Sequence, residues 1–178
     1  MNSFYLLKVS QIRALTSNAV ELKFEIPAEL YSKFNFIAGQ YITIKHQIGG
    51  EEVRRSYSIC SSIKEGISVG VKKVETGKMS SFLTTKIKEG DVLEVMPPTG
   101  NFVLQGKNVV GICAGSGITP ILSMIKTILL NNQFFKKLVM RILSERVMIL
   151  ELLSRKYCRL ILLVHMVVTC ALCCSGGI

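Results

Sequence analysis

The stretch VVGICAGSGITPILSMIKTILL, residues 109–130, decides how this chain is organised. It opens with a continuous apolar run, Val109–Cys113, of the kind that forms a buried parallel strand. The glycine-containing segment Gly115–Pro120 follows, and from Ile118 to Leu129 apolar residues recur at helical spacing. The stretch therefore predicts one strand–loop–helix unit, with the loop at the helix N-terminus.

The loop of this unit suits an anionic ligand. Gly115 and Gly117 let the main chain approach a ligand, and the helix N-terminus offers free amides and the positive end of its dipole. Thr119 can cap the helix, and Pro120 costs nothing in its first turn. The pattern favours a nicotinamide dinucleotide, although a proline replaces the third glycine of the common fingerprint. An ordinary tight turn stays open as the alternative.

The residues before this unit show a different pattern. Short apolar or alternating runs are separated by turn residues such as Gly49-Gly50, and several such runs predict a closed antiparallel barrel or a sandwich. Residues 105–107 form a short polar linker between the two patterns. We therefore expect a six-stranded barrel domain over 1–105 and a partial α/β domain over 106–178. A single helix is expected in the first half, at Ser80–Lys88. The expected strands are Tyr5–Val9, Ala19–Ile26, Gln40–Lys45, Arg55–Cys60, Ile67–Val74 and Val92–Met96.

The strand motif Arg55-Ser56-Tyr57-Ser58 carries candidate binding groups. Alternation along a strand places Arg55 and Tyr57 on one face, where a guanidinium can meet a pyrophosphate and a phenol ring can meet a planar heterocycle. Ser58 can hydrogen-bond a ring edge from the strand end. An ordinary strand with a surface arginine and a half-buried tyrosine is the alternative.

The segment Gly77-Lys78-Met79-Ser80 opens the helix of the first half. A helix N-terminus is a natural phosphate site, and Lys78 adds positive charge. A glycine turn followed by a serine cap would explain the same residues.

Together these motifs resemble the ferredoxin-NADP reductase superfamily of flavin-dependent reductases. Within it, the chain is most similar to the reductase components of phenylacetyl-CoA epoxidase and related oxygenases. The resemblance runs from about Phe4 to Leu130. It rests on motifs in family order: Phe36–Tyr41, Arg55–Ser58, Gly77–Ser80, Pro98–Phe102 and Ala114–Pro120. It implies an FAD-binding barrel followed by an incomplete Rossmann-like nicotinamide-binding domain.

The resemblance also implies roles for single residues. Arg55 would bind the FAD pyrophosphate, Tyr57 would pack on the isoalloxazine, and Ser58 would hydrogen-bond near the nitrogen that accepts hydride, which makes Tyr57 and Ser58 the candidate catalytic pair. The remaining cofactor-binding candidates are Val71 and Lys72 beside the flavin, Gly77, Lys78, Met79 and Ser80 at the pyrophosphate, and Gly115, Gly117, Thr119 and Pro120 at the nicotinamide nucleotide.

The charge of the chain is positive and uneven. The formal net charge is +10, and residues 131–178 carry seven Lys or Arg against two acids. Because the basic residues of the first part are dispersed and no RNA-binding or zinc-finger pattern occurs, we expect cofactor phosphates and not nucleic acid as the anionic partner. No secretory signal is visible, so we expect a cytoplasmic protein with reduced cysteines.

The segment 134–178 is atypical for such a domain. It lacks the turn residues that alternating strands and helices need, and our hypothesis is a truncated or out-of-frame end. Leu160–Cys174 is almost wholly apolar but short for a membrane span, so a membrane anchor is disfavoured. Cys170, Cys173 and Cys174 lack the further ligands of an iron–sulfur or zinc site, and no metal is expected.

These observations favour a flavin-dependent oxidoreductase that passes electrons from NADH or NADPH through FAD to an iron–sulfur or oxygenase partner. Two alternatives stay open. One is a non-catalytic FAD-binding fragment whose nicotinamide half is broken, and the other is a membrane-associated barrel without a cofactor.

Overall fold

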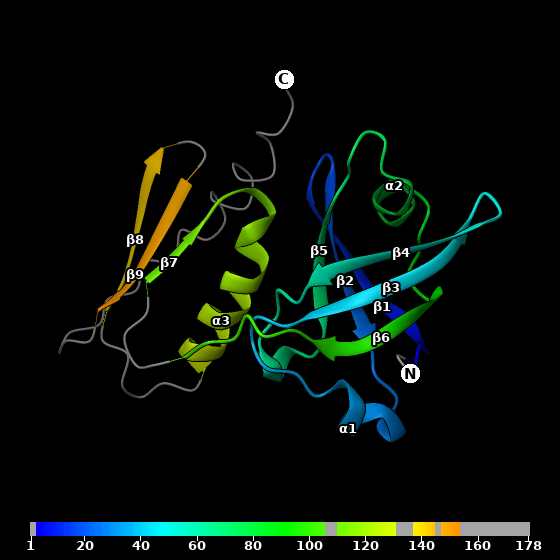
Figure 1. Ribbon diagram of the computed structural model, residues 1–178, viewed down its shortest axis with the longest axis horizontal. Helices are drawn as coiled ribbons and strands as arrows, with labels where there is room; N and C mark the ends of the chain where they lie inside the picture. The colour runs from blue at the N-terminus through cyan, green and yellow to red at the C-terminus, as the bar shows by residue number, and fades with distance from the viewer. Residues whose placement is uncertain (1–2, 106–109, 131–136, 145–146, 154–178) are drawn as a thin grey trace.

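The computed structural model describes residues 3–105, 110–130, 137–144 and 147–153 (Figure 1). Six antiparallel strands form one sheet in the order β4-β3-β6-β1-β2-β5, and an isolated bridge between Ile59 and Val69 brings the two edge strands together. The predicted six-stranded barrel is therefore confirmed. The strands are β1 (Tyr5–Thr16), β2 (Ala19–Glu25), β3 (Tyr41–Ile48), β4 (Glu51–Ser58), β5 (Ser68–Lys72) and β6 (Val92–Thr99).

Alternation of apolar residues builds the barrel core. In each of five strands, residues two apart point the same way, and their side chains are almost completely buried. These pairs are Leu7 and Val9, Leu22 and Phe24, Ile42 and Ile44, Val69 and Val71, and Leu93 and Val95. The buried face of the sheet therefore follows from the spacing of apolar residues in the sequence.

Short helices connect the barrel strands. Helix α2 (Lys78–Thr85) starts earlier and ends earlier than the predicted Ser80–Lys88, and its buried Met79 and Leu83 join the core. Phe82 of α2 stacks on His46 of β3, with ring centroids 4.4 Å apart. Helix α1 (Tyr31–Phe34) was not predicted, because a single turn shows no periodicity. The short 3₁₀ turns are η1 (Ala28–Leu30), η2 (Ile63–Glu65) and η3 (Gly115–Gly117).

The predicted strand–loop–helix unit is present as β7 (Val110–Cys113), η3 and α3 (Ile118–Leu130). The expected parallel pairing of this strand is wrong, however. Strand β8 (Lys137–Ser144) is followed by β9 (Val147–Leu153), and the sheet order is β7-β9-β8 with antiparallel neighbours. Strand β8 runs in the direction of β7, as expected after a helical crossover, but β9 returns between the two and reverses the pairing.

The last part of the chain is outside the described residues. This applies to the apolar segment Leu160–Cys174, with its cysteines, and to most of residues 134–178, for which an out-of-frame end stays a hypothesis. None of the helices in the described ranges has both the length and the apolar character that a membrane span requires.

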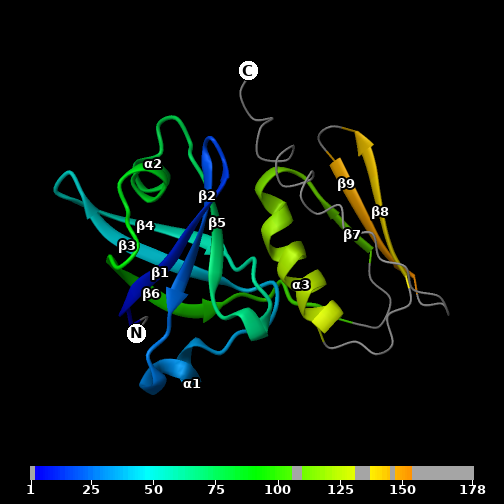
Figure 2. The same cartoon turned by 180° about the vertical axis from the view of Figure 1, so that it is seen from behind.

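Helix α3 lies between the barrel and the second sheet, as the two opposite views agree (Figures 1 and 2). Its buried Ile118, Ile121, Met124 and Ile125 form a cluster with Ala38 of the barrel. The neighbouring Gly39 has a φ of +103°, and a Cβ built there would lie 2.0 Å from the Phe102 carbonyl oxygen and 2.4 Å from Met124 Cε. Only glycine fits this point, where three segments of the chain converge.

Replacing Gly39 by alanine is expected to destabilise the fold strongly. The strained φ costs about 1–3 kcal/mol, and the overlap with Phe102 and Met124 adds a similar amount. Urea unfolding measures the loss. Gly49→Ala is the matched control, because its φ is also positive, at +62°, while nothing lies within 4 Å of the added Cβ. Equal losses for the two variants would contradict a packing role for Gly39.

Candidate functional site

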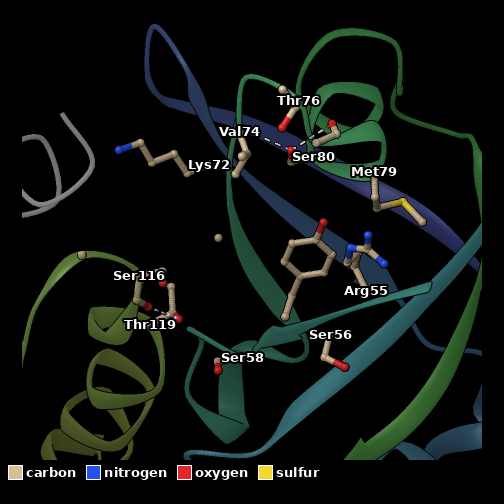
Figure 3. Close-up of a pocket in the computed structure, with 14 residues that line it drawn as sticks. Arg55, Ser56, Ser58, Lys72, Val74, Thr76, Met79, Ser80, Ser116 and Thr119 are labelled. Atoms are coloured by element: carbon tan, nitrogen blue, oxygen red, sulfur yellow. Dashed lines mark hydrogen bonds between the residues drawn. The ribbon is translucent and has the colours of Figure 1, made fainter. Parts of the chain in front are cut away.

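A cleft of about 620 Å³ opens where the barrel meets the N-terminal end of α3 (Figure 3). Ser116 and Thr119 lie on one side of it, Arg55 and Met79 on the other, and Ser58 between them. Its walls come from β4, from β5 with the turn that follows it, and from the loop before α3. The lining residues are Arg55, Ser56, Tyr57, Ser58, Gly70, Lys72, Val74, Thr76, Gly77, Met79, Ser80, Gly115, Ser116 and Thr119.

Strand β4 supplies a cation and a neutral aromatic ring. The exposed Arg55 donates from Nη1 to the carbonyl oxygen of Arg54, 2.7 Å away, which orients its guanidinium. The half-buried Tyr57 packs against the barrel core. Burial raises the pKa of Tyr57 to about 12, against the opposing effect of the Arg55 charge. The phenol is therefore protonated at neutral pH and offers an uncharged ring beside a cation.

The serines of β4 complete this wall. Both Ser56 and Ser58 reach the cleft although they alternate with Arg55 and Tyr57 along the strand. The hydroxyl of Ser56 lies 2.9 Å from that of Thr43 on the neighbouring β3. Ser58, the last residue of β4, stands opposite Tyr41 in the ladder.

The turn between β5 and α2 is held by Ser80. Its Oγ accepts a hydrogen bond from the Val74 amide at 3.1 Å and donates to the Gly77 carbonyl at 3.2 Å. A Cβ on Gly77 would lie 2.4 Å from Ser80 Oγ. The missing side chain at Gly77 thus allows the main chain to fold tightly at the start of α2 and to line the cleft.

The opposite wall is built by the loop before α3. Gly115 has a φ of +53°, and Thr119 Oγ1 donates to the Ser116 carbonyl at 2.9 Å. Thr119 reaches across to the barrel, because a Cβ on Gly70 of β5 would lie 3.1 Å from Thr119 Cγ2. The two walls therefore touch at the base of the cleft.

Most of the predicted site residues are brought together here, and four are not. The Val71 side chain is buried in the barrel core, and Lys78 pairs with Glu51 beside a neighbouring pocket. Gly117 and Pro120 do not line the cleft. Five further residues line the cleft without having been predicted: Ser56, Gly70, Val74, Thr76 and Ser116. Of these, only Gly70 carried a sequence signal, since a glycine inside a strand marks close approach.

The cleft fits a planar group with phosphates. Arg55 and Lys72 are in its lining, which contains no Asp or Glu among the described residues. Gly77 and Gly70 also line the cleft, and at both positions an added Cβ would crowd neighbouring atoms. A cationic wall, a neutral ring and a glycine turn at a helix N-terminus are the features that a flavin nucleotide needs.

Tyr57 is expected to titrate with a pKa near 12, above the value of 10 for an ordinary tyrosine. The unfolded chain releases the proton first, so this residue should lower the free energy of unfolding as the pH rises from 10 to about 12. The tyrosinate absorbance of the chain, compared with that of Tyr57→Phe, isolates its titration. A pKa at the ordinary value would contradict the burial of the phenol.

Comparisons with known proteins show the family to which this chain belongs. The family of oxidoreductase FAD-binding domains matches residues 6–104. One component of the 1,2-phenylacetyl-CoA epoxidase of Escherichia coli K12 is 42% identical over 135 residues, which are 72% of this chain and 38% of that protein. A flavohemoprotein of Pseudomonas aeruginosa is 44% identical over 94 residues, 51% of this chain and 24% of its own length. The chain therefore spans well under half of these relatives.

Solved structures show the same fold. A ferredoxin NADP⁺ reductase from Neisseria gonorrhoeae with bound FAD and NADP superposes with a TM-score of 0.59 at 22% identity, covering 73% of this chain and 53% of its own. Phthalate dioxygenase reductase gives a TM-score of 0.57 at 24% identity, covering 72% and 40%. With the family match over more than half of the sequence, the chain belongs to the oxidoreductase FAD-binding domain family.

Proposed function

We propose that this chain binds FAD in the cleft and serves as a reductase, carrying electrons from NADH or NADPH through FAD to an iron–sulfur or oxygenase component. The observation that supports this most is the meeting of two walls in one cleft. The barrel wall carries Arg55 and Tyr57, and the facing wall carries the Gly115–Thr119 loop. Two nucleotides can thus lie against each other between them.

The barrel wall would hold FAD. Arg55 and the amides at the start of α2 bind the pyrophosphate, with Met79 and Ser80 shaping that end, while Lys72 and the main chain at Val71 border the ring. Neutral Tyr57 packs on the flavin plane, since burial favours an uncharged ring there. Bound FAD supplies a two-electron acceptor and a one-electron donor; the protein supplies position and electrostatics.

The facing wall would hold the nicotinamide nucleotide. Gly115 and Gly117 expose main-chain amides, Pro120 shapes the first turn of α3, and Thr119 lies beside the nicotinamide. Close stacking at this point requires that Thr119 stay near β5, which the bare Gly70 allows. Ser58, between the two walls, would hydrogen-bond the reacting edge of the flavin.

The relatives suggest the class of electron acceptor. One is a component of phenylacetyl-CoA epoxidase, and one of the solved structures is described as a modular structure for electron transfer from pyridine nucleotides to [2Fe-2S]. From these two proteins we extend to this chain the proposal that its partner is an iron–sulfur or oxygenase component and that the chain works in the cytoplasm.

The alternative function, a non-catalytic FAD-binding protein, is supported by the antiparallel second sheet, which lacks the parallel pairing that the sequence predicted.

A visible absorption spectrum tests the proposal. The purified chain with FAD is expected to show a flavin spectrum that bleaches on anaerobic addition of NADH or NADPH. A flavin spectrum that persists would favour the non-catalytic alternative. A chain that binds no FAD would contradict the proposed site altogether.

Arg55→Ala is expected to weaken FAD binding by roughly tenfold or more, because charge-assisted hydrogen bonds contribute about 1.5–3 kcal/mol. Riboflavin, which has no phosphate, should bind equally to both proteins in a fluorescence-quenching titration. Arg54→Ala is the control, since that neighbouring guanidinium pairs with Glu52 at 2.6 Å. A loss of riboflavin affinity, or an equal loss in Arg54→Ala, would contradict the phosphate-binding role of Arg55.

A further inference from the structure

One face of α3 contacts the barrel at three points, two of which are polar. Thr119, Ser123 and Lys126 are spaced by four and three residues, so they share a face of the helix. Thr119 packs beside Gly70, the Ser123 hydroxyl bonds to Ser61, and Lys126 Nζ lies 3.3 Å from both carboxylate oxygens of Glu65. The face therefore follows the barrel surface from the cleft outward.

The central contact is fully buried. Ser123 Oγ donates to the carbonyl oxygen of Ser61 at 2.6 Å, and the two residues are 0% and 1% exposed. A hydroxyl removed from water requires a partner, and this partner lies 62 residues away in the sequence. The bond thus fixes the helix to one point of the barrel.

Ser61 is itself fixed to the floor of the cleft. Its hydroxyl donates to the Gly66 carbonyl and accepts from the Ser68 amide at 2.9 Å. Ser68 is the first residue of β5, and Gly70 follows two residues later on the same strand. A continuous set of hydrogen bonds therefore connects the middle of α3 to the strand that Thr119 touches.

The apolar and ionic contacts of this helix with the barrel restrict its position less narrowly than a hydrogen bond does. Ile118, Ile121 and Ile125 pack in an apolar cluster, and such packing is not directional. The Lys126–Glu65 pair is partly exposed and contributes little. The buried Ser123–Ser61 hydrogen bond, with its narrow range of distance and angle, adds a directional contact to the close packing of Met124 at Gly39.

We propose that Ser123 is a positioning residue for the reaction: through Ser61 it sets the separation between the Gly115–Thr119 loop and β5, and so the place of the nicotinamide against the flavin. The placing of the nicotinamide against the flavin rests on the proposed function. The position of α3 on the barrel does not depend on that function, because it follows from contacts within the chain.

The helix contains a matched control. Thr127, one turn after Ser123, has a buried Oγ1 without a hydrogen-bond partner among the described residues. Ser123→Ala and Thr127→Val each remove one buried hydroxyl from the same helix. Only the first removes a bond to the barrel.

Hydrogen exchange of the full chain, without added cofactor, tests the position of the helix. In Ser123→Ala the amides of residues 118–130 should exchange roughly tenfold faster, with the barrel strands unchanged. Thr127→Val should leave the exchange of the helix as in the original chain. Unchanged exchange in Ser123→Ala, or an equal increase in both variants, would overturn the proposal.

Cofactor measurements separate positioning from general loosening. Ser123→Ala should bind FAD within twofold of the original chain, while its flavin bleaches roughly tenfold more slowly at saturating NADH or NADPH. A normal bleaching rate, or a parallel loss of FAD affinity, would overturn the proposal. If the original chain binds no FAD or does not bleach, the proposed function has failed, and the exchange measurement alone decides the role of Ser123.

Discussion

The close approach of three chain segments at Gly39 is the constraint on which the rest of the molecule depends. The Phe102 carbonyl and Met124 occupy the space that a side chain at position 39 would need. Helix α3 can therefore rest on the barrel, and the loop before it can face β4 and β5. Without this approach there would be a barrel and a helix, but no shared cleft.

The cleft divides its chemistry between the two walls. The barrel wall has the fixed positive charge of Arg55 and a phenol that burial keeps neutral. The facing wall has small residues and exposed main chain. Cys60 follows Ser58 by two residues. Burial, reinforced by the negative charge of Glu21, raises the pKa of its thiol to about 12. This cysteine is therefore an inert part of the packing.

The sequence was enough to predict the barrel strands and the unit that contains α3, because apolar residues recur there with clear periods of two and of about 3.6. It also indicated Arg55, Tyr57 and the glycine turn at Gly77. The sequence could not indicate Ser123 or Ser61, since a serine within an apolar helix has no periodic signature and its partner is distant. The place of β9 was equally hidden, because strand order depends on long-range pairing that local pattern does not encode.

The strand order of the barrel has a consequence for how the chain folds as it is made. Strand β6, the last of the six in the sequence, lies in the middle of the order, between β3 and β1. Until it is added, the strand pairing between the β3–β4 pair and the β1–β2–β5 group consists, among the described residues, of the isolated bridge between Ile59 and Val69. A nascent chain on the ribosome therefore holds two incomplete sheets until Thr99 has emerged, and the barrel wall of the cleft is completed late in synthesis.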